Sequence, residues 1–271
     1  MTKYLFIFLL MITYSIIGWC GEMVYCSIGQ RRLCEKRGFL NGPICPIYGH
    51  GALVVLIALH GGCSSPILTF FLGAILTSLV EYVTSFAMEK LFHMRWWDYS
   101  RYRFHLNGRI CLLNSTLFGL ASVVLCHFAN PPIAAWLTNL FTIGAGVPLS
   151  IVILLIYLAD IVLSVRSAIQ IGDRLAKLHT VQEELSNKLE EMRSEAFQSM
   201  HATLEPLAEH TGELTARLEA VKAEAQQKLH TLYERQDIFE RRLLHSFPTL
   251  QSIRHPETMK KWREYLMNRK K

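Results

Sequence analysis

The feature that most constrains this chain is a set of long apolar runs in its first 165 residues. The run from Tyr4 to Ile28 has 25 residues, and the run from Pro66 to Phe92 has 27. At about 1.5 Å per residue, a helix of either length crosses a hydrocarbon core about 30 Å thick. Only helices and closed barrels span a bilayer, because every backbone N–H and C=O group must be paired there. We therefore predict an all-α, polytopic membrane helix bundle.

Further apolar stretches bring the number of predicted transmembrane helices to about five: Pro46 to His60, Ile110 to Cys126, and Leu149 to Val165. The short run from Ile133 to Thr142 is predicted to be an external or re-entrant helix. Basic residues gather in the connections 29–37 and 90–109 and are absent from 61–65 and 127–148. Short basic loops stay in the cytoplasm. The pattern predicts a multi-pass membrane protein, with its amino terminus outside and its carboxyl-terminal half cytoplasmic.

The second part of the chain is charged rather than apolar. Residues 1–165 hold 10 Lys or Arg and 6 Asp or Glu, whereas residues 166–271 hold 18 and 16. Steps of four and three residues connect Leu178, Gln182, Leu185, Leu189, Met192 and Ala196, and after Pro206 the pattern resumes at Leu214, Leu218, Val221, Ala225 and Leu232. This spacing is typical of a coiled-coil seam. It fits a helical hairpin or a long kinked helix that pairs with another copy, and we favour a homo-oligomer.

The chain is thus predicted to have a transmembrane domain (1–165), cytoplasmic coiled-coil helices (166–246) and a basic carboxyl-terminal tail (247–271). A basic tail next to a bilayer commonly contacts anionic membrane lipids, although a solvated, disordered tail fits as well. The formal net charge of +6 is not accompanied by any nucleic-acid recognition motif, so no nucleic-acid partner is predicted.

An irregular segment separates the first two apolar runs. Glycine and proline punctuate residues 38–51, at Gly38, Gly42, Pro43, Pro46 and Gly49. Irregular backbone at membrane depth needs protein cover or a wet cavity, and short, interrupted apolar segments are typical of transporter binding sites. The alternative is an interfacial loop followed by a short tilted helix.

Two carboxylates lie inside apolar runs. Glu22 shares a helix face with Ser15 and Gly18, and Glu81 lies on a polar stripe with Thr77, Thr84 and Ser85. Intramembrane carboxylates are costly and usually face a bundle interior or a polar cavity. Arg109 is the expected partner of Glu22 or Glu81. The predicted functional polar cluster comprises Glu22, Asn41, Glu81, Glu89, Asp98, Asn107 and Arg109. Trp96 and Trp97 are predicted to be interfacial anchors.

Several activities have no motif in this chain. It contains no G-x-x-x-x-G-K-[ST] loop, no H-E-x-x-H and no G-x-S-x-G. Its seven cysteines form no CxxC pair and have no histidines at metal-ligand spacing. We therefore predict no metal site, no cofactor, no catalytic residues and no enzymatic activity.

Five blocks together resemble a known family: Gly18-Trp19 with Glu22, the segment Gly38 to Gly49, Glu81-Tyr82 with Met88-Glu89, Trp96-Trp97-Asp98-Tyr99, and Asn107-Gly108-Arg109-Ile110. The chain is similar over residues 1–165 to the type IV, CmpB-like family of bacterial ABC-transporter permeases. This resemblance implies an inner-membrane permease. Because the chain has no Walker loop, the resemblance also implies a separate ATPase subunit.

Three functions fit the sequence. The leading one is a transporter or permease-like protein with a cytoplasm-facing polar cavity, in which Glu22 and Glu81 bind a cationic group or a proton. The second is a membrane scaffold or sensor that does not transport and acts through its coiled coil. The third is an intramembrane enzyme that acts on a lipid, with a Glu as base and Arg109 binding phosphate.

Overall fold

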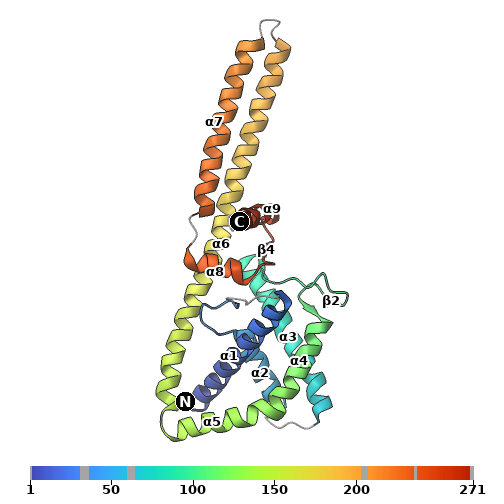
Figure 1. The fold of residues 1–271 in the computed structure, drawn as a ribbon, viewed down its shortest axis with the longest axis vertical. Coiled ribbons are helices and arrows are strands. Elements are labelled where there is room, and N and C mark those ends of the chain that lie inside the picture. The colour runs from blue at the N-terminus through green and yellow to red at the C-terminus, as the bar shows by residue number, and fades with distance from the viewer. Residues whose placement is uncertain (1, 31–36, 60–64, 203–206, 235–236, 269–271) are drawn as a thin grey trace. The chain divides into compact units, whose positions relative to one another are not determined.

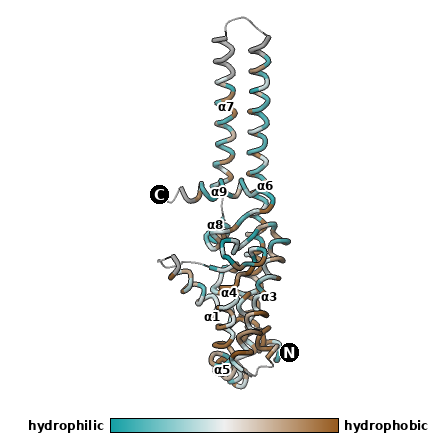
Figure 2. Tube along the Cα trace, turned by 90° about the vertical axis from the view of Figure 1, so that its right-hand side faces the viewer, coloured by the Kyte–Doolittle hydropathy of each residue, from teal (hydrophilic) through white to brown (hydrophobic). Residues whose placement is uncertain are grey.

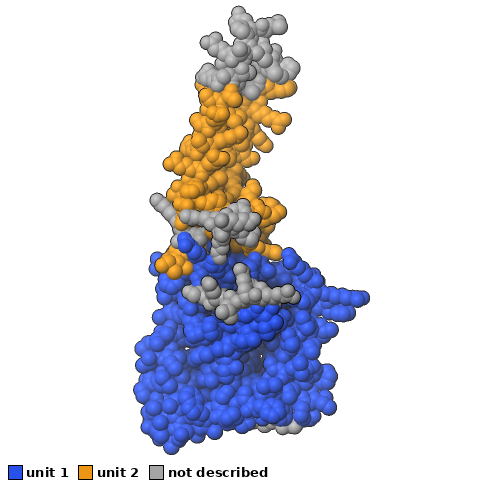
Figure 3. Space-filling model, in the orientation of Figure 1, with its two compact units in different colours: residues 1–168, 239–250 blue, residues 169–238, 251–271 orange. Residues whose placement is uncertain are grey.

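The computed structural model describes residues 2–30, 37–59, 65–202, 207–234 and 237–268. The chain divides into two compact units (Figure 3). The first contains Met1–Ala168 together with Phe239–Leu250, and the second contains Ile169–Ile238 together with Gln251–Lys271. A stretch near the carboxyl terminus therefore returns to the unit that holds the apolar helices.

The predicted all-helical class is confirmed (Figure 1). The helices of the first unit are α1 (Thr2–Gln30), α2 (Pro46–Ala58), α3 (Pro66–Phe92), α4 (Leu112–Val124), the π-helix η1 (Leu125–Ala129), α5 (Asn130–Thr142), the start of α6 (Gly146–Ala202), and nearly all of α8 (Ile238–Ser246). Short strands β1 (Met94–Arg95), β2 (His105–Leu106) and β3 (Ile110–Cys111) lie between α3 and α4, and β2 pairs antiparallel with β3.

Among the described residues, four helical stretches are long and apolar enough to cross a membrane: Thr2–Ile28, Pro66–Phe92, Leu112–Thr142 and Gly146–Glu195. Helix α2 is apolar but shorter, with 13 residues. On α3, apolar side chains point outward at Ile67, Phe71, Ile75 and Leu79. Figure 2 shows that α1, α3 and α4 are largely hydrophobic, whereas α7 is hydrophilic. An outward-facing apolar surface of this kind suits lipid, and the chain is a multi-pass membrane protein.

Small residues bring the helices of the first unit together. A Cβ at Gly73 of α3 would collide with Ser122 of α4, and a Cβ at Gly119 would meet the Phe70 ring and carbonyl. The Ser78 and Ser115 hydroxyls lie 2.7 Å apart across the same interface. Ser115, Gly119 and Ser122 of α4 thus form a small-residue face that packs against α3.

Helix α4 does not end as a simple span. It passes through the π-helix η1 into α5, and Figure 1 shows α5 running across the end of the bundle. Pro131 and Pro132 lie at the start of α5, where their missing N–H groups weaken the ladder to the preceding turn. Together with the π-turn, they account for the change of direction. The short separate helix predicted at Ile133–Thr142 corresponds to α5.

In the second unit, the later part of α6 and α7 (Leu207–Glu234) run side by side (Figures 1 and 2). Arg174 Nη1 donates to the Leu232 carbonyl at 3.0 Å. Seam residues of both helices, such as Leu185, Leu189, Leu218 and Val221, are less exposed than most of their neighbours. The intramolecular hairpin is therefore the arrangement observed, and it uses the seam to which self-association was attributed. The homo-oligomer remains a prediction.

The basic tail also has structure. After the short strand β4 (Gln251–Ser252), residues Pro256–Asn268 form α9, whose Trp262 is fully buried. Tyr265 stacks on Tyr233 of α7 with ring centroids 4.7 Å apart, and Thr258 donates to Gln182 of α6. Residues 256–268 are therefore a packed helix of the second unit and not the solvated disorder considered above.

Candidate functional site

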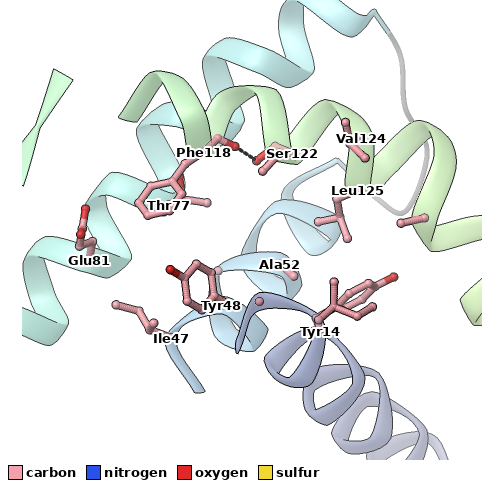
Figure 4. A pocket seen from close by; sticks show the side chains of 15 residues that line it. Tyr14, Ile47, Tyr48, Ala52, Thr77, Glu81, Phe118, Ser122, Val124 and Leu125 are labelled. Carbon is pink, nitrogen blue, oxygen red and sulfur yellow. Dashed lines mark hydrogen bonds between the residues drawn. The ribbon is translucent and has the colours of Figure 1, made fainter. Parts of the chain in front are cut away.

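The first unit contains a cavity of about 340 Å³ between α1, α2, α3, α4 and η1. Figure 4 shows its lining, with Glu81 and Tyr48 toward one end and Tyr14, Val124 and Leu125 toward the other. Most of the lining is aliphatic or aromatic. Its polar side chains are Tyr14, Tyr48, Thr77, Glu81 and Ser122. The cavity therefore has a single carboxylate and four hydroxyl groups in a largely apolar surface.

Glu81 is buried, with 4% of its surface exposed. Its Oε1 accepts a hydrogen bond from the Tyr99 hydroxyl at 3.1 Å, whereas its Oε2 has no hydrogen-bond partner among the described residues. Burial raises the pKa of Tyr99 and the neighbouring Glu81 charge raises it further, so the Tyr99 hydroxyl stays a protonated donor. A buried acceptor without a partner costs free energy, and this cost points to a group that Glu81 binds.

Glu22 lies beside the same end of the cavity. Its Oε2 accepts from the Tyr48 hydroxyl at 3.0 Å, and the Cys45 thiol lies 3.9 Å away. Glu22 and Glu81 bind different tyrosines, Tyr48 and Tyr99, and no hydrogen bond joins the two carboxylates among the described residues. Tyr48 lines the cavity and thus connects it with Glu22. Glu22 therefore contacts the cavity lining through its hydrogen bond with Tyr48.

The irregular segment 37–45 is held by a carboxylate from α6. Asp160 Oδ1 accepts from the Asn41 backbone and side-chain amides, both at 2.8 Å, and its Oδ2 accepts from the Gly42 backbone at 2.7 Å. The Asn41 side chain also donates to Ser164, one turn later on α6. The irregular backbone predicted here is confirmed, and Asp160 satisfies the N–H groups that such a backbone leaves open.

The carbonyl groups of the same segment face α8. The Arg242 guanidinium donates to the carbonyls of Gly38, Phe39 and Leu40. In the opposite direction, Arg37 Nη1 donates to the Ser246 carbonyl at 3.0 Å. Burial lowers the pKa of Arg242 while the nearby Asp160 raises it, and an arginine stays charged throughout. Gly38 adopts φ +96°, a backbone conformation that favours glycine.

A second polar cluster lies where α3 ends. Arg109 Nη2 pairs with Glu89 Oε1 at 2.7 Å, and Arg95 Nε lies 3.5 Å from the other oxygen of Glu89. The expected pairing of Arg109 with Glu22 or Glu81 is therefore wrong. Arg109 also packs over the rings of Tyr82 and Phe86. A lipid phosphate would therefore have to compete with Glu89 for Arg109.

A tight turn at Asn107-Gly108 positions Arg109 beside Glu89. Asn107 and Gly108 both have positive φ, and the Arg109 N–H donates to the Leu106 carbonyl, as in a type I′ turn. The Asn107 amide donates to the Tyr82 hydroxyl at 2.9 Å. A Cβ at Gly108 would meet Asp98 and Ser100. Asn107 and Gly108 thus lie in the turn between β2 and β3 and join this cluster.

Asp98 closes the second cluster. Burial opposes its charged form, but hydrogen bonds from the Ser100 hydroxyl and backbone amide, together with the charge of Arg95, hold the pKa of Asp98 below its usual range. Arg95 Nη1 lies 3.7 Å from Asp98 Oδ1. Asp98 therefore stays ionised at neutral pH and orients Arg95.

Trp96 has a different role from the interfacial anchor that was predicted. It is 2% exposed and packs edge-on against Phe39, Phe92 and Phe247, with ring centroids 5.0 to 5.7 Å apart. The interfacial reading is wrong for Trp96, because neighbours from three segments cover it. Trp97 donates its indole N–H to the Arg109 carbonyl. Both tryptophans thus fix the positions of the irregular segment and of the turn.

The predicted polar residues therefore separate into three groups: Glu22 and Glu81 at the cavity, Asn41 in the irregular segment, and Glu89, Asp98, Asn107 and Arg109 at the end of α3. Pro46 begins α2, and Gly49 packs against α1. The sequence did not single out the partners that hold these groups: Tyr48, Tyr99, Asp160 and Arg242. Each of these partners lies at least 18 residues from the group that it binds, so helical periodicity gives no signal for the contact.

Comparison with curated proteins found no match, and comparison with solved structures found none either. One family model matches residues 9–165, which cover the apolar helices, the irregular segment and both polar clusters. The family predicted from the five sequence blocks is confirmed. The chain belongs to the family described as "Putative ABC-transporter type IV".

Proposed function

We propose that this chain is the membrane subunit of a transport system, and that its bundle binds a small ligand in the cavity beside Glu81. The observation that carries this proposal is the carboxylate of Glu81, a residue that lines a largely apolar cavity of about 340 Å³ and whose buried Oε2 has no hydrogen-bond partner among the described residues. Ligand pockets commonly measure about 300 to 1,000 Å³ and combine apolar walls with few polar groups. The cavity fits that description.

The surroundings of the cavity support a transport role. A carboxylate within an apolar helix is costly and is typical of a substrate or ion pathway. The wall next to it is α2, a short helix preceded by the irregular segment 37–45, and interrupted segments are common at transporter binding sites. The family to which the chain belongs is also described as a transporter family.

The energy source would be a second protein. The sequence has no Walker-type phosphate loop, so an ATPase subunit would have to bind from the cytoplasm. The connections 29–37 and 90–109 carry the basic residues of the first half, which favours a cytoplasmic location for that end and for the second unit, in the inner membrane. Glu81 lies two turns before Glu89 on α3, so the carboxylate end of the cavity would face the cytoplasm.

Complementation of a null strain tests this proposal. We expect Glu81→Gln to abolish restored growth or uptake at normal membrane abundance, because the amide preserves the shape and can still accept from Tyr99, but it lacks the charge. The matched control is Glu190→Gln, the same substitution at an exposed position of α6. We expect it to behave like the wild type.

A shortened hairpin distinguishes the scaffold alternative. Deleting residues 189–202 and 207–220 removes two heptads from each helix and keeps the remaining pairs in register, whereas truncation at Val165 would also remove the part of α8 that binds the irregular segment. Transport predicts that the shortened chain restores function. Full activity of Glu81→Gln would contradict the proposal, and loss of activity only in the shortened chain would favour a scaffold.

A further inference from the structure

The cavity lining offers a ligand more hydrogen-bond acceptors than donors. All its hydroxyls donate to the protein: Tyr14 to Asn130 Oδ1, Tyr48 to Glu22 Oε2, Thr77 to the Gly73 carbonyl, and Ser122 to the Phe118 carbonyl. A hydroxyl has one donor hydrogen and two acceptor lone pairs. What these four side chains can still offer a ligand is therefore acceptor capacity, and Glu81 Oε2 adds another acceptor.

Among the described residues, the only charged side chain in the cavity lining is the acidic Glu81. No Lys, Arg or His is among its lining residues. Arg109, which was expected to pair with Glu22 or Glu81, is bonded to Glu89. Glu22 adds a second negative charge behind Tyr48. An anion or a ligand with acceptors alone would meet repulsion and unpaired groups here, whereas a cation with N–H donors would satisfy Glu81.

The apolar part of the cavity lining favours a ligand with an apolar body. Its lining includes Ile17 and Phe118, and Val124 and Leu125 lie toward the end away from Glu81. The rings of Tyr48 and Phe118 meet edge-on at 6.3 Å, and aromatic faces attract cations. A ligand that fills this space has a charged group at one end and an apolar body at the other.

We propose that the cavity takes a small lipophilic ammonium cation, whose N–H groups donate to Glu81 Oε2 and whose apolar body lies toward Leu125. This inference rests on the proposed function, for which it names the class of ligand. It also gives the charge of Glu81 a role, since the ammonium group of the ligand would neutralise the carboxylate.

Three matched probes test the inference on the purified full chain: 2-phenylethylammonium, the neutral 2-phenylethanol and the anionic 3-phenylpropanoate. The thermal unfolding midpoint is followed by tryptophan fluorescence as each probe is titrated. A ligand that binds only the folded state raises the midpoint in a concentration-dependent way. We expect the ammonium probe to bind at least tenfold more tightly than the alcohol, and the anion not to raise the midpoint.

Variants of the chain control for partitioning of the probes into detergent, because the detergent is the same for each variant. Glu81→Gln is expected to abolish the preference for the ammonium probe, and Glu190→Gln is expected to keep it. Equal or tighter binding of the alcohol or the anion overturns this inference but leaves the cavity as a ligand site, so the proposed function survives. If no probe binds while Glu81→Gln still abolishes complementation, the inference also fails, and Glu81 then handles a proton alone.

Discussion

Replacing Asp160 with alanine is expected to lower the free energy of unfolding by about 3 kcal/mol or more, because buried donors left without acceptors cost about 1 to 3 kcal/mol each. The Asn41 and Gly42 backbone amides and the Ser164 hydroxyl lose the acceptor that Asp160 provides, whereas the Asn41 side chain keeps its hydrogen bond to Ser164. Arg242, whose pKa Asp160 raises, would also lose a neighbouring charge. The measurement is the unfolding midpoint of the purified chain, followed by tryptophan fluorescence.

The control for this variant is Asp173→Ala, on the same helix at an exposed position. It removes the same side chain without freeing the segment 37–45. We expect its midpoint to stay near that of the wild type. Equal midpoints for the two variants would show that Asp160 does not hold the irregular segment.

Adding a methyl group at Gly49 is the second change expected to have a large effect. A Cβ there would collide with the Ser15 hydroxyl and with the Met11 backbone carbonyl of α1. Overpacking costs about 1 to 3 kcal/mol, and because a backbone carbonyl cannot rotate away, we expect a loss near the upper end. Separation of α1 from α2 would also displace Tyr48 and its hydrogen bond to Glu22.

Gly51 offers a matched control two residues later on the same helix. A Cβ there would lie 3.6 Å from Thr77 Cγ2, an ordinary contact. Alanine favours helix over glycine by about 1 kcal/mol, so Gly51→Ala is expected to preserve or raise the unfolding midpoint while Gly49→Ala lowers it. A lowered midpoint in both variants would mean that α2 tolerates no side chain on this side, and an unchanged midpoint in both would contradict the close packing at Gly49.

The sequence predicts the helices well because each is defined locally. Helix α3 begins at Pro66 and ends at Phe92, as the apolar run predicted. Proline suits the first turn of a helix, and an apolar run of this length is typical of a membrane-spanning helix. The glycines and prolines of residues 38–51 likewise predicted a non-helical segment, which the structure has at 37–45, whereas residues 46–51 belong to α2. Glu22 and Glu81 were recognised because charge within an apolar run is conspicuous.

The partners of these residues were beyond the reach of local patterns. Asp160 lies 118 and 119 residues from the two amides it binds, and nothing in α6 distinguishes it from an interfacial carboxylate. Arg109 was assigned to the wrong acid because the turn at Asn107-Gly108, with positive φ at both residues, brings it to Glu89. The return of residues 239–250 to the first unit was hidden because their composition resembles that of the charged helices before them.

The measurement that tests the central claim most directly is a structure of the full chain in lipid nanodiscs with saturating 2-phenylethylammonium. The account predicts density for the probe inside the cavity, with its nitrogen at a hydrogen-bond distance of about 2.7 to 3.2 Å from Glu81 Oε2 and its ring toward Leu125. A cavity closed by repacking, with Glu81 Oε2 bonded to a protein side chain and the probe absent, would contradict it.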